Sequence, residues 1–155
     1  MLYKSRDIHR ILTSDGKLKN RRIHLQHLES GLSDSGLCLK GTCAFEGEHL
    51  KNLFSPIVPA IYIIGTIEDA HVVHFLDRLG KIPLLIHFYR FNLTRPIREK
   101  EIISFTSHLG SFRRGYFFSE VVIHREKSII GGISGSYRLV ANSKSLFRLG
   151  GYDGV

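Results

Sequence analysis

Residues 54–64 read Phe54-Ser55-Pro56-Ile57-Val58-Pro59-Ala60-Ile61-Tyr62-Ile63-Ile64, a loop with two prolines followed by an apolar run. From Pro59 to Leu79 the apolar residues recur at spacings of three and four, which predicts a helix of about 20 residues. Gly80 supplies a stop signal for this helix. Apolar side chains occupy most of the helix circumference at its N-terminal end. We therefore expect other parts of the chain to enclose the helix.

Strand-forming segments lie on both sides of the predicted helix. Before it, residues 23–28 and 37–45 are predicted strands, and residues 30–36 form a hairpin-like loop between them. After it, a high density of Val, Ile, Phe and Tyr predicts strands over residues 83–92, 101–109, 116–124 and 128–140. This order of elements predicts an α+β fold in which a curved antiparallel sheet wraps a long central helix.

The chain has the size and composition of one globular domain. It contains 155 residues, of which 43% are hydrophobic and 23% are charged. We expect an N-terminal segment with the first strand (1–36), a core (37–140) and a C-terminal tail (141–155). The N-terminus lacks the apolar stretch of a signal peptide, and charged residues interrupt the longest apolar segment. These features predict a cytoplasmic protein without a membrane span.

Charge, cysteine and histidine content narrow the functional classes. The net charge of +8 favours an acidic partner, but no helix-turn-helix or zinc-finger signature accompanies it, so we do not expect nucleic acid. Cys38 and Cys43 are five positions apart on one predicted strand and face opposite sides, which argues against a disulfide. His71 and His74 lie three apart on the helix, but buried or capping histidines explain them better than a metal does. We expect neither a metal nor a cofactor.

Two segments resemble motifs of a known enzyme family. Pro56-Ile57-Val58-Pro59-Ala60 resembles the Pro-Val-Met-Pro-Gly motif at the helix start of the hotdog-fold β-hydroxyacyl-ACP dehydratases of fatty-acid synthesis, and the segment from Arg90 to Ile102 resembles a second motif of that family. The resemblance covers roughly residues 37–140. It implies a hotdog fold, a homodimer or higher homo-oligomer, and a thioester substrate carried by acyl carrier protein (ACP) or CoA. The substrate-binding positions that it implies are Pro59, Ala60, Tyr62 and Gly65.

The resemblance breaks at the two residues that perform the family's chemistry. A histidine removes a proton from the substrate and a carboxylic acid helps the hydroxyl group to leave. These positions fall on Lys51 and Gly65, neither of which is suited to the role. The candidate substitutes are His49, two positions before Lys51, and Asp69 or Glu68, about one helical turn beyond Gly65.

Three functions follow from this pattern. The first is a dehydratase, a lyase whose catalytic groups have moved. The second is a thioesterase in which Asp69 or Glu68 activates water against a thioester carbonyl held at Ala60. The third is a non-catalytic protein that binds acyl groups or ACP. In each case an acidic carrier would dock on basic residues. The candidates are Arg95, Arg98, Arg113 and Arg114.

Overall fold

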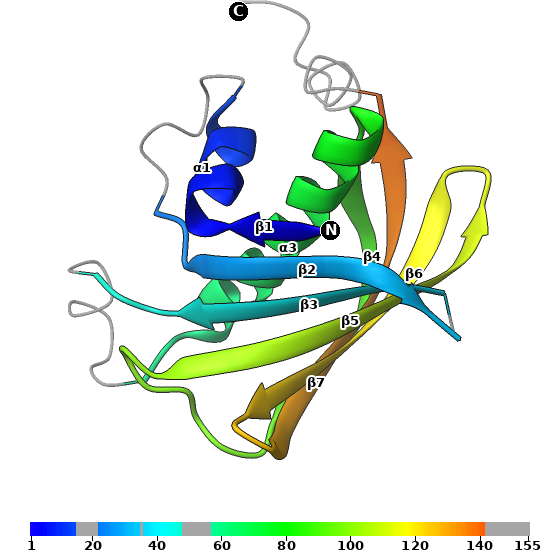
Figure 1. Cartoon of the computed structure of the whole chain (residues 1–155). Coiled ribbons are helices and arrows are strands. Elements are labelled where there is room, and N and C mark those ends of the chain that lie inside the picture. Colours follow the sequence, from blue (N-terminus) through cyan, green and yellow to red (C-terminus); the bar gives the residue numbers. More distant parts are fainter. Residues whose placement is uncertain (15–21, 35, 48–56, 142–155) are drawn as a thin grey trace, which may run out of the picture.

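One antiparallel sheet curves around a central helix (Figure 1). The structure is a computed structural model that describes residues 1–14, 22–34, 36–47 and 57–141. The elements are β1 (Leu2–Lys4), α1 (Ser5–Thr13), β2 (Leu25–Ser33), β3 (Gly36–Ala44), α3 (Ala60–Leu79), β4 (Ile82–Leu93), β5 (Ile102–Arg113), β6 (Tyr116–Arg125) and β7 (Ser128–Val140). The strand order is β1-β2-β3-β5-β6-β7-β4, and every neighbouring pair is antiparallel. The predicted α+β class is confirmed.

The helix α3 has the predicted bounds. It begins at Ala60, directly after Pro59, whose extended backbone (φ −61°, ψ 144°) brings the loop into the helix. It ends at Gly80, which adopts the left-handed conformation (φ 61°) and donates its N–H to the carbonyl of Leu76. Only glycine adopts this conformation without a Cβ penalty, so Gly80 ends the helix as predicted.

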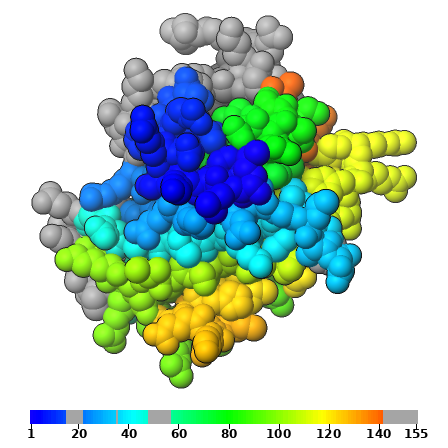
Figure 2. All heavy atoms as spheres, viewed as in Figure 1, coloured from blue at the N-terminus to red at the C-terminus, as the bar shows by residue number. Residues whose placement is uncertain are grey.

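The N-terminal segment packs on the same core. The amphipathic helix α1 buries Ile8, Ile11 and Leu12, and the Tyr3 hydroxyl donates a hydrogen bond of 2.9 Å to Asp77 at the end of α3. Figure 2 shows the blue N-terminal atoms in contact with the green atoms of α3. Strand β2, which falls in the predicted N-terminal segment, pairs with β3 in the same sheet. The predicted tail lies outside the described residues from position 142 onward.

Several strand ends differ from the prediction. Strand β2 continues to Ser33, into the segment predicted as a loop, and β5 continues to Arg113 although the sequence predicted an end at Leu109. The connection from β5 to β6 is a tight turn in which Arg114 and Gly115 both have positive φ (51° and 81°). The short strand β1 was not predicted. In each case pairing with a neighbouring strand sets the strand end, and small polar residues are tolerated once they are paired.

The described residues leave one side of α3 open. We call this side the open flank; it consists of Ile61, Ile64, Gly65, Glu68 and Val72. Ile61 is 71% exposed and the other four are half-buried. The sheet ends beside the flank at β4, which pairs with β7 alone among the described strands. Within the described residues, the predicted enclosure of the helix by other structure therefore does not extend to this flank.

The described residues include both cysteines and two helices. Cys38 and Cys43 are both buried, and both thiols are free. Neither described helix combines the length and the apolar character needed to cross a lipid bilayer. The nine-residue α1 is too short, and the longer α3 carries Glu68, Asp69, Asp77 and Arg78.

Candidate functional site

A carboxyl group with an unusual proton affinity lies at the edge of the open flank. Glu68 extends from α3 toward β7, where the Tyr137 hydroxyl donates a hydrogen bond of 2.5 Å to Glu68 Oε1. Burial raises the pKa of Glu68 to about 7; the hydrogen bond from Tyr137 opposes this rise and the nearby Asp69 adds to it. At neutral pH the carboxyl group is therefore near its midpoint of titration. That is the condition for efficient proton uptake and release.

Tyr137 is held firmly as the hydrogen-bond donor of this pair. Its side chain is 2% exposed, and its ring stacks on Phe117 at a centroid distance of 5.0 Å and an interplanar angle of 8°. Burial, followed by the charge of Glu68, raises the pKa of Tyr137 far above the physiological range. The phenol thus stays protonated, and its position fixes one carboxylate oxygen of Glu68.

A second polar cluster lies deeper, between α3 and the sheet. His71 is fully buried; its Nε2 lies 2.9 Å from Ser107 Oγ on β5 and 3.3 Å from Ser119 Oγ on β6. The two serine oxygens are 2.9 Å apart. Burial, with a smaller contribution from the neighbouring His74, lowers the pKa of His71 to about 3. The imidazole is therefore neutral, and its ring packs edge-on against Tyr137 at 5.0 Å.

This deeper cluster supports the site and does not itself meet substrate. A serine beside a neutral histidine is the arrangement of an activated nucleophile. Ser107, however, is fully buried, whereas Glu68 is half-buried beside the open flank. The cluster fixes the rotation of α3 on the sheet, because polar groups in a dry interior require their partners. It thereby positions Glu68 opposite Tyr137.

The catalytic candidates predicted from the sequence differ in their exposure to solvent. Asp69 is 3% exposed and lies in the interior, whereas Glu68 is half-buried beside the open flank. Neighbouring helix residues point about 100° apart, so the two carboxyl groups occupy different environments. Gly65 lies on the open flank, one turn before Glu68. His49 and Lys51 lie outside the described residues.

The substrate-binding candidates cluster at the N-terminus of α3. Ala60 is exposed, no side chain caps this end of the helix, and Tyr62 is half-buried with its ring 6.1 Å from that of His24. Free N–H groups at a helix N-terminus attract negative charge. Ala60 and Glu68 are separated by about 12 Å along the helix axis, given a rise of ~1.5 Å per residue. Within one chain, a carbonyl held by Ala60 is therefore too far from a water molecule held by Glu68.

The four docking candidates do not form one patch. Arg95 and Arg98 precede β5 and lie at a pocket of about 370 Å³. Arg113 and Arg114 lie at the opposite end of β5, in the turn to β6. A strand of this length separates the two pairs by roughly 35 Å at ~3.3 Å per residue.

Sequence reasoning missed the sheet residues of the site. Tyr137 contacts Glu68 across 69 positions of the chain, and Ser107 contacts His71 across 36. No local pattern links positions so far apart. One signal was present: Ser107 and Ser119 occupy inward positions of strands whose alternation predicts apolar residues there.

Comparisons with known proteins establish the fold. Neither a protein-family model nor a curated protein matches the chain in sequence. Among solved structures, the putative thioesterase yhdA of Lactococcus lactis matches with a TM-score of 0.64 and 11% identity, over 76% of this chain and 93% of that one. The fluoroacetyl-CoA thioesterase FlK matches with a TM-score of 0.60 and 13% identity, over 88% of this chain and 100% of that one.

A third match shows the limit of this likeness. The virulence protein Cj0977 of Campylobacter jejuni has a TM-score of 0.61 and 10% identity, over 88% of this chain and 92% of that one. The predicted hotdog fold is confirmed by these structures. Membership of the dehydratase family is not shown. At such identities a shared fold does not establish a shared activity.

Proposed function

We propose that the protein is an acyl-thioester hydrolase in which Glu68 is the general base. The observation that carries this proposal is the carboxyl group with a pKa of about 7, held by Tyr137 beside an open apolar flank. A base with this pKa is half-ionised at neutral pH and can accept a proton from water. The names of two structural neighbours, a protein described as a putative thioesterase and the thioesterase FlK, favour hydrolysis over the dehydration that the sequence motifs suggested first.

The proposed reaction needs one carboxyl group and one set of carbonyl-polarising donors. Tyr137 occupies Oε1 of Glu68, and no hydrogen bond among the described residues involves Oε2. Oε2 accepts a proton from water while the water oxygen attacks the thioester carbonyl carbon. The tetrahedral intermediate collapses with cleavage of the C–S bond, and the protonated Glu68 returns the proton to the departing thiolate. The products are a free carboxylic acid and a free thiol.

A second copy of the chain completes the site in this proposal. Ile61 on the open flank is strongly exposed, and the adjoining edge strand β4 exposes Ile86, Phe88 and Tyr89. Exposed apolar side chains next to an unpaired strand edge are typical of an interface. A two-fold axis through the middle of the flank sets the two helices antiparallel, so that each flank covers the other.

The same two-fold arrangement places Glu68 across the interface from the N-terminal part of the partner's helix. The flank runs from Ile61 to Val72, and the axis places the N-terminus of the partner's helix next to Val72. The axial offset between that N-terminus and Glu68 is then about 7 Å, at ~1.5 Å per residue, and the Glu68 side chain lies between the two helices, whose axes are ~8–10 Å apart. The partner's helix N–H groups can then polarise the carbonyl that water on Glu68 attacks.

Thiol release from acyl-CoA and acyl-ACP of several chain lengths tests the proposal. We expect release by the natural protein and a loss of at least 100-fold in kcat for Glu68→Gln. Glu120→Gln is the matched control because Glu120 is exposed on β6 and pairs only with the exposed Arg90 among the described residues. Formation of an enoyl product instead of free thiol would support the dehydratase alternative. Salt-sensitive binding without turnover would support the non-catalytic alternative.

A further inference from the structure

We infer that the pocket beside residues 94–101 binds the phosphate group at the end of the carrier's pantetheine arm. This inference deepens the proposed function, because it names the part of the substrate that a second site recognises. The pocket has a volume of about 370 Å³ and is lined by Arg95, Pro96, Arg98, Glu101 and Arg125. Both CoA and ACP present a phosphate at this point of the arm, so the shared chemistry is a pantetheine phosphate.

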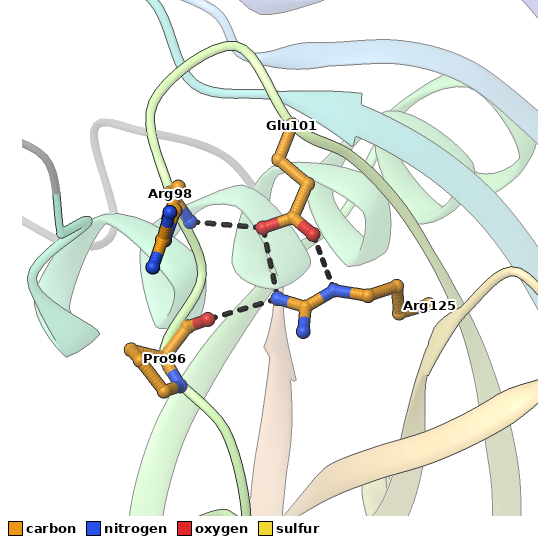
Figure 3. A network of polar contacts seen from close by, with 4 residues as sticks. All are labelled: Pro96, Arg98, Glu101 and Arg125. Carbon is orange, nitrogen blue, oxygen red and sulfur yellow. Dashed lines mark hydrogen bonds and ion pairs between the residues drawn. The ribbon is translucent and has the colours of Figure 1, made fainter.

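The walls of the pocket are built by an internal ion pair (Figure 3). Arg125 on β6 forms an ion pair with Glu101 and donates a further hydrogen bond of 2.8 Å to the carbonyl of Pro96. The backbone N–H of Arg98 donates to Glu101 Oε2 at 3.0 Å. Glu101 and Arg125 are each only 25% exposed, so this network is shielded and fixes the loop between β4 and β5.

The network leaves positive charge unpaired at the rim. Arg125 neutralises Glu101, and in Figure 3 the backbone N–H of Arg98, and not its guanidinium group, is joined to this network. Among the described residues, neither Arg95 nor Arg98 forms a side-chain ion pair, and both are exposed. The guanidinium groups of two arginines thus lie at the rim of a pocket whose walls are fixed. A guanidinium group binds phosphate through paired hydrogen bonds.

The pocket is joined directly to the N-terminus of α3. The N–H of Val58 donates a hydrogen bond of 2.8 Å to the carbonyl of Ile97, and Ile57 forms a β-bridge with Arg98. Paired residues in such a bridge have Cα atoms ~5 Å apart, and three residues of chain from Ile57 to Ala60 span at most ~10 Å. Arg98 therefore lies within about 15 Å of the helix N-terminus, where the proposed site holds the thioester carbonyl.

This separation suits a pantetheine arm. About a dozen bonds join its sulfur to its phosphorus, and an extended chain covers ~3.3–3.6 Å for every three bonds, so the reach is about 15 Å. The second arginine pair does not meet this condition. Arg113 and Arg114 are roughly 35 Å away, at the other end of β5.

Calorimetric titration with 4′-phosphopantetheine and with pantetheine, which lacks the phosphate, tests the inference. We expect phosphopantetheine to bind at least about tenfold more tightly, and Arg98→Ala to remove that difference. The hydrogen bond from the backbone N–H of residue 98 to Glu101 is kept in this variant, so the loop between β4 and β5 remains held in place. Arg113→Ala is the matched control and should leave both affinities unchanged. Equal affinity for the two compounds, or an unchanged preference in Arg98→Ala, would overturn the inference.

The same compounds separate this inference from the proposed hydrolysis. If hydrolysis is right and the phosphate site is wrong, acyl-pantetheine and acyl-phosphopantetheine will be cleaved with the same KM. If the phosphate site is right and hydrolysis is wrong, phosphopantetheine will still bind through Arg98 but no thiol will be released. Comparison of acyl-CoA with acyl-ACP then identifies the carrier. A higher kcat/KM for one of them that Arg98→Ala reduces supports the site, and no effect of Arg98→Ala on either contradicts it.

Discussion

Replacing Glu68 by Gln should change the way in which stability depends on pH. The pKa of Glu68 is about 7 in the folded protein and 4.5 in its ordinary, solvated state. The folded state thus binds the proton more tightly than the unfolded state. The contribution of this group to stability is complete below pH 4.5 and is lost as the pH rises through 7.

The size of the effect follows from the difference between the two pKa values. A difference of about 2.5 pH units at ~1.36 kcal/mol per unit amounts to about 3 kcal/mol. His71 acts in the opposite direction: burial lowers its pKa from 6.5 to about 3, so its contribution is lost as the pH falls below 6.5. The natural protein therefore shows a mixed profile. The difference between it and the Glu68→Gln variant cancels His71 and isolates Glu68.

Urea unfolding at a fixed protein concentration, repeated from pH 4.5 to pH 8, measures this difference. We expect the Glu68→Gln variant to gain about 3 kcal/mol in free energy of unfolding relative to the natural protein over this range. Glu120→Gln makes the same change of charge at an exposed position and should give a parallel curve. Parallel curves for Glu68→Gln as well would show that Glu68 has an ordinary proton affinity, and the proposed role as a base would lose its physical basis.

Three further predictions concern neighbouring features. Tyr137→Phe removes the hydrogen bond that lowers the pKa of Glu68, so the rise of kcat/KM with pH should move upward by about one pH unit; an unmoved profile would contradict the pairing. Gly41→Ala places a Cβ against the ring of Phe105, and urea unfolding should show a loss of about 1–3 kcal/mol. Phe88→Asp puts a charge on the exposed edge strand β4, and light scattering should show a monomer if this edge forms the dimer.

The fold could be predicted from the sequence because the patterns that indicate its helix and strands are local. The three-and-four spacing of apolar residues and the stop at Gly80 define α3 within the segment itself. The strands after it are rich in β-branched and aromatic residues. The ends of the strands were harder to predict, because Ser33 and Arg113 belong to strands only through pairing with a neighbouring strand. Pairing depends on which strand lies alongside, and composition does not report that.

The site was accessible only in part, for the same physical reason. Glu68 could be identified because its position on α3 follows from helical spacing. Its proton affinity could not, because this depends on burial by distant segments and on Tyr137, 69 positions away. The grouping of the arginines also required the structure. Arg95 and Arg113 both lie near the ends of predicted strands. In the structure β5 separates them, because Arg95 precedes this strand and Arg113 ends it.

The position of Glu68 reconciles two requirements that usually conflict. A carboxyl group acquires a pKa near 7 only where water is largely excluded, yet a base must meet its substrate. Glu68 lies at the boundary: its side toward β7 is shielded by Tyr137, and its other side adjoins the open flank. In the proposed dimer, the second chain covers this flank, removes more water from the carboxyl group and raises its pKa further. The proposal thus predicts that association and the proton affinity of Glu68 are linked, since both depend on the same exposed surface.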